Sequence, residues 1–518
     1  MSWDRELEEL RRRREAAARL GGEERVARHR AAGKLTVRER IAALLDPESF
    51  SEIGSITGKA IYGVDGEIEE FQPANFVMGR GTIDGRPVVV GGDDFTVRGG
   101  AADAAIHRKQ VYSEQMAREL RIPIVRLVDG QSGGGSVKSY EEFGRTYVPP
   151  LMGWEHAVAM LAEVPVLAAA LGPVAGLGAA RMVTSHFSVM VEGIAQVFVA
   201  GPPVVAYATR EDVDKETLGG AAIHTRNGVI DNPASSEQDA FDQIRRFLSY
   251  LPSNAWEIPP RVEPSDDPKR REEALLSIIP RERRRVYDVR RLLSLILDRD
   301  SFFEIGPCWA RSVVTGLARL NGFPVGVLAS DPRHAGGTLT ADGSDKLRRF
   351  VDLCDAFHVP IASFVDQPGF TVGVDAEKTA TIRRGATAIA ALYQAGVPFF
   401  SVIIRRAFGV AGAALVDRGD PDLRVAWPSG DWGSLPVEGG IEAAFRRQLA
   451  EAADPEALRK QILDGIEAIR SPFRTAEMFL IEEIIDPRDT RPLLCDWIVI
   501  AYRRVSHDLG PRSNRYRP

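Results

Sequence analysis

Uninterrupted apolar runs alternate with helical patterns along the whole chain. Runs such as 88–90 (VVV) and 122–128 (IPIVRLV) are typical of buried strands. In the segment 104–120 between them, apolar residues recur at helical spacing, and the second half of the chain shows the same rhythm, with buried strands expected at 359–365 and 397–404. Alternating strands and helices with apolar strands predict βαβ units and an α/β fold.

The order of these elements repeats within the chain. The stretch 36–54 (TVRERIAALLDPESFSEIG) resembles 288–306 (DVRRLLSLILDRDSFFEIG) at one constant offset. Three later blocks repeat at a nearly constant offset, and their anchor pairs are Pro87 with Pro324, Asp129 with Asp366, and Pro165 with Pro398. Four matched blocks in the same order predict that the chain is two copies of one domain.

A segment rich in proline and charge, 257–285, lies between the two copies. Such a composition is typical of a linker, and an ordinary surface loop would also fit a domain boundary there. We therefore expect an N-terminal domain over 1–265 and a C-terminal domain over 280–518. The charged helical pattern at 4–20 predicts a solvated helix, with a contact between subunits as the alternative.

Composition narrows the class of protein. The 518 residues exceed one ordinary core and favour two domains of about 200–250 residues each. The content of 44% hydrophobic and 27% charged residues is that of an ordinary soluble protein. A net charge of −6, spread along the chain, gives no reason to expect nucleic acid as a partner, whereas a small anionic ligand needs only a few local donors.

The three cysteines and the chain's apolar runs bear on its compartment. Cys308, Cys354 and Cys495 show no metal-binding spacing, and scattered thiols suit a reducing cytoplasm. The charged N-terminus lacks the apolar core of a signal peptide. One run, Gly385–Ile404, contains no charged residue and is as long as a membrane span. Because Gly396 and Pro398 interrupt it, a buried helix, a turn and a buried strand are expected, with no membrane contact.

Three loops rich in small residues follow predicted buried strands: 129–139, 172–180 and 407–414. In α/β folds, ligands bind in loops beyond the carboxyl ends of the strands. Tight turns or close helix packing would explain each loop singly, but equivalent positions in two copies favour a shared role. We interpret the loops as oxyanion holes, in which paired backbone N–H groups stabilise a developing enolate oxygen. Arg405 and Arg406 precede the third loop.

The first loop also contains a GxSxG pattern at 130–134. This pattern can mark a nucleophile elbow with Ser132 as the attacking group, but an elbow needs a helix directly after it, and the second copy has no counterpart. A glycine-rich ligand loop is the better interpretation. Asp129 and Asp366 end equivalent strands, where helix capping or turn formation is the ordinary role of aspartate.

Familiar catalytic motifs are absent from the sequence. It contains no GxxxxGK[ST], HExxH or EF-hand motif, and its eight histidines lie apart, so we expect packed or surface histidines and no metal site. A site built from backbone donors fits chemistry in which the ligands bring the reactivity.

Longer stretches resemble a known family, the carboxyltransferase (β) subunits of biotin-dependent acyl-CoA carboxylases, which include propionyl-CoA and methylcrotonyl-CoA carboxylases. The resemblance extends from about residue 24 to 511, and its specific stretches are RHRAAGKLTVRERIAALLDPESFSEIG, FVAGPPVV, EDVDKETLGGAAIHT, GGTLTADGSDKLRRFVDLCDAFHVPIASFVDQPGF, IRRGA and VAWPSG. It implies two tandem crotonase-like domains of the ClpP/crotonase ββα-superhelix type, in agreement with the internal duplication.

The resemblance also implies a reaction. Carboxybiotin on a carrier of a partner subunit releases CO2, and the enolate of an acyl-CoA attacks it; the biotin enolate itself is the expected base. The oxyanion hole for the thioester oxygen is expected at Gly133 and Gly134, and the one for the biotin ureido oxygen at the N–H groups of Val410 and Ala411. Further residues expected to bind acyl-CoA or biotin are Ser132, Gly135, Gly176, Gly178, Gly369, Phe370, Gly409, Gly412 and Ala413.

The resemblance implies partners as well. Because no Met-Lys-Met biotin-attachment motif and no ATP-grasp domain are found, a biotin carboxylase and carrier (α) subunit is expected as the partner. The β subunits are expected to form a hexameric core, with the site between the first domain of one subunit and the second domain of another.

The sequence departs from the family in the first loop, and this leaves alternatives open. The loop reads DGQSGGGSV, with two extra residues and no arginine, so its oxyanion hole or acyl pocket is expected to be reshaped. The small Ala413 would permit a larger acyl group, and the substrate stays open. Two other functions remain, the carboxyltransferase of a biotin-dependent decarboxylase and a non-catalytic scaffold in a mixed complex.

Overall fold

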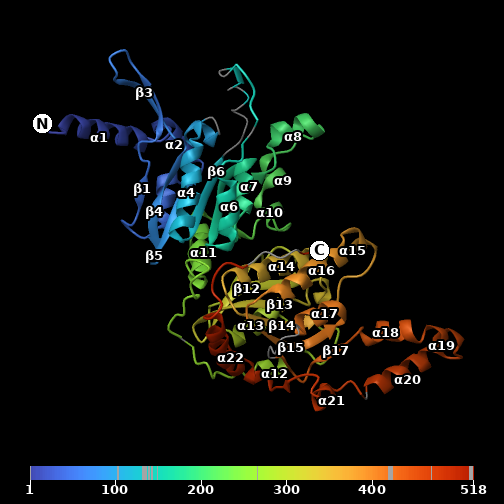
Figure 1. Cartoon of the computed structure of the whole chain (residues 1–518). Coiled ribbons are helices and arrows are strands. Elements are labelled where there is room, and N and C mark those ends of the chain that lie inside the picture. Colours follow the sequence, from blue (N-terminus) through green and yellow to red (C-terminus); the bar gives the residue numbers. More distant parts are fainter. Residues whose placement is uncertain are drawn as a thin grey trace. The chain divides into compact units, whose positions relative to one another are not determined.

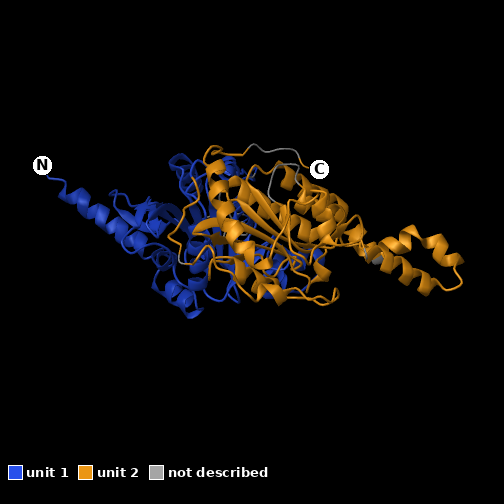
Figure 2. Ribbon diagram, turned by 90° about the horizontal axis from the view of Figure 1, so that it is seen from below, with its two compact units in different colours: residues 1–257 blue, residues 258–518 orange. Residues whose placement is uncertain are grey.

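A computed structural model gives the fold of the chain (Figure 1). It describes all residues except 1, 102–103, 131–136, 138–139, 142–143, 149, 265, 418–423, 468, 513–516 and 518. Two compact units divide the chain, unit 1 over Met1–Glu257 and unit 2 over Ile258–Pro518 (Figure 2).

Each unit is built on an eight-stranded sheet. In unit 1 the strands follow the order β1-β4-β5-β6-β7-β8-β10, with β9 beside β7. The first three strands are antiparallel and all the others are parallel. Their bounds are β1 Ser51–Ile53, β4 Phe76–Ile83, β5 Arg86–Asp93, β6 Ile124–Gly130, β7 Val166–Ala175, β8 Phe187–Val191, β9 Gln196–Phe198 and β10 Asn232–Ala234.

Unit 2 repeats this sheet strand by strand, in the order β11-β12-β13-β14-β15-β16-β18, with β17 beside β15. Its strands are β11 Phe303–Ile305, β12 Val313–Leu320, β13 Phe323–Ser330, β14 Ile361–Gln367, β15 Phe399–Phe408, β16 Arg424–Ala426, β17 Asp431–Gly433 and β18 Glu483–Ile484. The predicted duplication is confirmed, because residues paired by the repeat occupy equivalent strands. Asp129 and Asp366 lie near the ends of β6 and β14, and the paired prolines Pro165 and Pro398 directly precede β7 and β15.

The antiparallel hairpin of each sheet turns in the same way. Asp84 and Gly85 join β4 to β5 with φ angles of 50° and 77°, and Asn321 and Gly322 join β12 to β13 with 51° and 76°. Two consecutive left-handed residues form the type I′ turn, whose twist matches that of the strands, and Asp-Gly and Asn-Gly are its preferred sequences.

Helices connect the strands of both units (Figure 1). Unit 1 contains α1 Asp4–Ala18, α2 Glu23–Ala31, α3 Val37–Leu44, α4 His107–Leu120, α6 Trp154–Ala159, α7 Leu177–Val183, α8 Pro202–Thr209, α9 Lys215–Gly219, α10 Ala221–His224 and α11 Glu237–Tyr250, and a hairpin of β2 Gly58–Tyr62 and β3 Ile68–Pro73. Unit 2 contains α12 Leu275–Ile278, α13 Val289–Ile296, α14 Ala341–Ala356, α15 Val374–Lys378, α16 Thr381–Gln394, α17 Gly409–Val416, α18 Val437–Ala444, α19 Arg446–Glu451, α20 Pro455–Glu467, α21 Pro472–Glu477 and α22 Thr490–Val505.

The helix that opens each repeat begins at a side-chain cap. Thr36 accepts a hydrogen bond from the Glu39 amide, and the Glu39 carboxylate accepts one from the Thr36 amide, which is a complete capping box for α3. In unit 2, the Asp288 carboxylate caps α13 by accepting hydrogen bonds from Arg290 and Arg291. Both helices therefore begin at equivalent positions of the repeat.

The core of unit 2 shows how the apolar strands are covered. Residues of α13 and α22 pack with alternate residues of β12 and β13 in one hydrophobic cluster that includes Val325 and Val327. On the opposite face, Gly326 lies against Cys354 of α14. Because side chains of a strand alternate between faces, this arrangement is a sheet buried between two helical layers.

The segment predicted as a linker is largely part of unit 2. Val262 N–H donates to the Gly322 carbonyl, and Arg270 forms an ion pair of 2.9 Å with Asp266. Arg491 of α22, which is fully buried, donates to the Asp266 and Asp267 carbonyls at 3.4 and 2.9 Å. The division between the units consequently falls at the start of this segment, at 257/258.

The uncharged run Gly385–Ile404 is divided as the sequence suggested: α16 ends at Gln394 and β15 begins at Phe399. Among the described helices, none combines the length and the apolar character that crossing a bilayer requires.

Candidate active site

The turn from β15 into α17 is the point where the third glycine-rich loop meets the sheet. Phe408 is still extended, and Gly409 has a φ of 61°, which favours glycine. Phe408 places no side-chain cap on α17, and the first N–H groups of a helix have no acceptor within the helix. The turn therefore presents the N–H groups at Val410 and Ala411 as donors.

Close packing accounts for the other small residues of this stretch. A Cβ atom on Gly412 would lie 2.7 Å from the carbonyl carbon of Ala407, so only glycine lets α17 approach β15 this closely. Ala411 and Gly412 are buried, whereas Val410 is 62% exposed and Ala413 is exposed. The side of the turn that carries Val410 is consequently accessible.

Unit 1 contains the counterpart of this turn between β7 and α7. Gly176, which the repeat pairs with Gly409, has a φ of 60° and again leaves its helix without a side-chain cap. Gly178 is buried, in the position equivalent to Ala411. The predicted site residues Gly176 and Gly178 therefore lie where Gly409 and Ala411 lie in unit 2.

A second loop follows the strand beside each turn. In unit 2, Gly369 has a φ of 122°; its N–H donates to Gln367 Oε1 at 3.0 Å, and its carbonyl accepts from the Leu339 amide at 3.0 Å. The Phe370 ring packs on Gly385 of α16, where a Cβ atom would clash with it at 2.4 Å. In unit 1, Ser132, Gly133, Gly134 and Gly135 lie outside the described residues.

Asp366 at the end of β14 is buried and holds two arginines. Its Oδ2 accepts two hydrogen bonds from Arg405, at 2.8 and 3.0 Å, and one from the Tyr287 hydroxyl at 3.1 Å. Its Oδ1 accepts a hydrogen bond from Arg406 at 2.6 Å. Burial alone would raise the pKa of Asp366, but Arg406 and Arg405 outweigh it and hold the pKa below its ordinary value. Burial together with the Asp366 charge raises the pKa of Tyr287 well above its ordinary value.

Asp129 is the counterpart in unit 1, but its partner comes from elsewhere. Arg40 of α3 donates to Asp129 at 2.8 Å and to Glu237 of α11 at 2.6 Å. Lys34 lies 3.7 Å from the same Asp129 carboxylate, and burial lowers the pKa of Lys34. Both aspartates join the strand ends to neighbouring elements through ion pairs with arginine, and capping or turn formation is not their role.

Unit 1 also contains a basic pocket of about 430 Å³. Its lining residues are Arg25, Arg28, His29, Ala32, Lys34, Phe95, Thr96, Arg98 and Gly99. The Lys34 ammonium lies over the Phe95 ring, 5.3 Å from its centroid. A pocket with this many cations suits an anionic group such as a phosphate.

One histidine, His358, is packed inside unit 2, as expected for a packed or surface histidine. His358 is fully buried, and its ring nitrogens contact the Gly510 amide at 3.3 Å and Arg512 at 3.1 Å. Among the described residues, His, Cys, Asp and Glu side chains form no group of three that could hold a metal ion.

Comparison with known proteins assigns the chain to a family. The sequence matches the Carboxyl transferase domain over residues 28–513. The chain belongs to this family. It is 35% identical over 512 residues to the propionyl-CoA carboxylase carboxyltransferase subunit of Haloferax mediterranei, covering 98% of both chains. It is also 34% identical over 474 residues to the methylmalonyl-CoA decarboxylase subunit alpha of Veillonella parvula, covering 91% of both.

Solved structures agree with the family assignment. The chain superposes on one chain of the transcarboxylase 12S hexamer, crystallised with methylmalonyl-coenzyme A and methylmalonic acid, with a TM-score of 0.86 and 32% identity. The match covers 100% of this chain and 98% of that one. The carboxyltransferase family predicted from the sequence is confirmed, and so is the fold of two tandem crotonase-like domains.

Sequence reasoning missed the partners that fix these loops. The Arg405–Arg406 pair was visible beside the third loop, but its contact with Asp366 joins residues about 40 positions apart. The pairing of Asp129 with Arg40 links residues 89 positions apart, and the repeat offered no guide because the other unit uses a different arginine. Only the buried positions of both aspartates at equivalent strand ends hinted at such anchors.

Proposed function

We propose that the chain is the carboxyltransferase subunit of a biotin-dependent acyl-CoA carboxylase. The observation that carries this proposal is the family match over nearly the whole chain, together with two equivalent turns that present backbone donors, one in each unit. Carboxybiotin on the carrier of a partner subunit supplies the CO2, and the acyl-CoA supplies the enolate carbon that receives it.

The turn at Gly409 supports a role in unit 2. We assign the N–H groups of Val410 and Ala411 to the ureido oxygen of biotin, with Gly409 and Gly412 shaping the turn and Ala413, Gly369 and Phe370 beside it. Charge that develops on this oxygen is stabilised by fixed donors, which need no reorganisation during the reaction.

Two loops of unit 1 are candidates for the thioester oxygen. Gly133 and Gly134, with Ser132 and Gly135, are the residues suggested by the family pattern. The internal repeat supports the turn at Gly176 instead, because it is the counterpart of the Gly409 turn, with Gly178 in the place of Ala411. We propose this turn as the first oxyanion site. The basic pocket around Lys34 and Arg98 is suited to the phosphates of coenzyme A and supports assigning the acyl-CoA to unit 1 and biotin to unit 2.

Assembly and compartment complete the proposal. We propose a hexameric β core in the cytoplasm, with active sites shared between unit 1 of one subunit and unit 2 of another. The hexamer of the 12S relative supports this assembly.

A carboxylation assay tests the function. The chain is combined with its biotinylated partner, ATP and bicarbonate, and a panel of short, branched, unsaturated and long acyl-CoAs is followed by mass spectrometry. A gain of one carboxyl group on one acyl-CoA is expected. No product across the panel, with a partner shown to carboxylate its own biotin, would contradict the proposal and favour a scaffold.

A second candidate is the carboxyltransferase of a biotin-dependent decarboxylase, which the likeness to the Veillonella subunit favours. The same assay run with methylmalonyl-CoA and uncarboxylated carrier separates the two directions. Carboxyl transfer to the carrier without ATP-driven transfer to any acyl-CoA would support the decarboxylase.

A further inference from the structure

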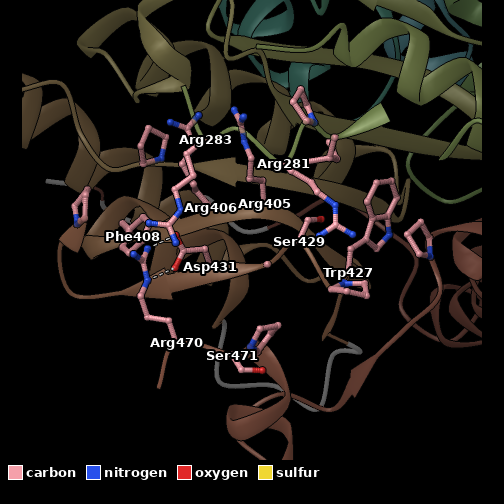
Figure 3. Close-up of a pocket in the computed structure, with 18 of the residues that line it drawn as sticks. Arg281, Arg283, Arg405, Arg406, Phe408, Trp427, Ser429, Asp431, Arg470 and Ser471 are labelled. Carbon is pink, nitrogen blue, oxygen red and sulfur yellow. Dashed lines mark hydrogen bonds and ion pairs between the residues drawn. The ribbon is translucent and has the colours of Figure 1, made fainter. Parts of the chain in front are cut away.

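A pocket of about 710 Å³ lies in unit 2, at the carboxyl ends of β14, β15 and β16 (Figure 3). Pro368 follows β14, Phe408 ends β15 and Trp427 follows β16, and all three line the pocket. This volume is typical of small-molecule sites. Because Phe408 directly precedes Gly409, the pocket adjoins the turn assigned above to the ureido oxygen.

Arginine dominates the lining. Six arginines line the pocket, and they come from three segments: Arg281, Arg283 and Arg284 before α13, Arg405 and Arg406 on β15, and Arg470 after α20. Figure 3 labels all of them except Arg284. Two carboxylates line it, Asp431 and Glu467, and a third, Asp366, binds Arg405 and Arg406. Six cations against three carboxylates leave an excess of three positive charges.

Not all of these arginines are committed to protein partners. Arg470 forms ion pairs with Asp431 and with Glu467, and Arg283 contacts Glu467 at 2.8 Å. Within the described part of the chain, the exposed side chains of Arg281 and Arg284 make no hydrogen bond or ion pair. These two guanidinium groups are available to a ligand at the pocket mouth.

Unit 1 forms the same strand ends without arginines at these positions. When the two copies are aligned by their matched blocks, Arg281 corresponds to His29 and Arg284 to Ala32. In the same way, Arg405 corresponds to Gly172 and Arg406 to Pro173. His29 and Ala32 line the basic pocket of unit 1, whose cations lie at other positions, so these four arginine positions are specific to unit 2.

We propose that Arg281 and Arg284 bind a carboxylate in this pocket, and that this carboxylate is the one carried by the donor that unit 2 receives. The second part rests on the proposed function. Guanidinium groups bind carboxylates through paired, charge-assisted hydrogen bonds. The ureido ring of biotin is uncharged until it is carboxylated, so surplus positive charge favours the loaded carrier over the empty one and lets the empty carrier leave.

Binding of a simple carboxylate tests the first part. The linewidth of [13C]acetate is measured by NMR with the full chain, with the double variant Arg281→Ala/Arg284→Ala, and with Arg503→Ala, an exposed arginine of α22, as the matched control. Broadening is expected with the wild type and the control and is expected to be lost in the double variant. Equal broadening in all three proteins would overturn the site.

Kinetics with the biotinylated partner tests the second part. The double variant is expected to raise the KM for the carboxylated carrier by about tenfold, while the KM for acyl-CoA and inhibition by the uncarboxylated carrier stay unchanged. An equal loss of affinity for both carrier forms would overturn the assignment, because the arginines would then bind acidic side chains of the carrier. If the wild type transfers no carboxyl group, the proposed function fails, and the acetate experiment still decides whether the pocket binds a carboxylate.

Discussion

Gly409 lies where an extended strand becomes a helix within one residue. Its φ of 61° and the 2.7 Å approach of Gly412 to Ala407 show that the small residues serve conformation and packing at once. Neither the backbone conformation nor the close packing is specific to catalysis. The equivalent turn at Gly176 shows that both units of the fold form it. The role proposed for this turn rests on the backbone donors that it leaves beside an accessible surface.

Replacing Val410 by proline removes one of these donors with little change in fold. Proline is tolerated in the first turn of a helix, Val410 is 62% exposed, and the preceding glycine has no Cβ to clash with the ring. We expect kcat to fall by about 100- to 1,000-fold, the usual effect of losing an oxyanion donor. Val410→Ala keeps the N–H group and serves as the control. A kcat for Val410→Pro equal to that of Val410→Ala would remove this donor from the mechanism.

Asp366 predicts a pH-dependent stability. Asp366→Asn leaves Arg405 and Arg406 without their counter-charge, and we expect a loss of about 3 kcal/mol in the free energy of unfolding. The pKa of Asp366 is lowered in the folded state. The contribution of this carboxylate to the free energy of unfolding is therefore fully present above about pH 4, the pKa of an aspartate in the unfolded chain. It is lost as the pH falls through the lower pKa of the folded state. Urea unfolding across acidic pH should therefore show a flatter profile for the variant.

The matched control for this experiment is Asp375→Asn, since the Asp375 side chain is 99% exposed. It should change stability by less than about 0.5 kcal/mol. A wild-type and an Asp366→Asn profile that remain parallel at low pH would show that the carboxylate is not the anchor inferred here.

At the level of elements, the repeat preserves a lysine that ties a helix to the first strand of each sheet. Lys346 of α14 is buried and donates to the carbonyls of Gly306, Trp309 and Val313 at 2.8, 2.9 and 2.7 Å. Its counterpart, Lys109 of α4, donates to the Gly54 carbonyl at 2.9 Å. One ammonium thus joins elements that the chain's local pattern does not connect.

We expect Lys346→Met to destabilise the chain by about 3 kcal/mol, because three buried carbonyls lose a charged donor. Lys109→Met, which removes one such hydrogen bond, should cost about 1 kcal/mol. Denaturant unfolding of the two variants compares them directly. Equal losses would mean that the additional acceptors of Lys346 contribute nothing.

Helices and strands were largely predictable because their patterns are local. The capping box at Thr36, the Asp-Gly and Asn-Gly turns, and the apolar runs of β6 and β15 each specify an element within a few residues. The partners of Asp129, Asp366 and Lys346 were not predictable, since these contacts join distant segments, and the arginine partners of the two aspartates differ between the copies. The Ser132–Gly135 loop lies outside the described residues, so its role stays a prediction.

On the scale of the whole molecule, two copies of one fold have diverged in their surfaces. Unit 1 keeps a basic pocket beside Lys34, and unit 2 has an arginine-lined pocket beside Phe408. Each unit also exposes apolar side chains on or directly after its helices, among them Tyr207 of α8 at 79% and Met478 after α21 at 72%. Exposed apolar groups of this kind are typical of surfaces that meet another subunit.

The assembly is expected to be a hexamer of the 56.7 kDa chain. Light scattering of the purified chain should give a mass near six times that of the monomer, and dilution should lower carboxylation activity only where the hexamer dissociates. A monomer with full activity would contradict the proposal that the site is shared between subunits.

Transfer of label from the carrier is the most direct test of the account. The biotinylated partner is first carboxylated with [14C]bicarbonate and freed of ATP, and the chain is then added with the acyl-CoA identified by the panel. The account predicts that the label leaves the carrier and appears on the acyl-CoA in a single turnover. Label that stays on the carrier, with the complex intact, would contradict carboxyl transfer by this chain.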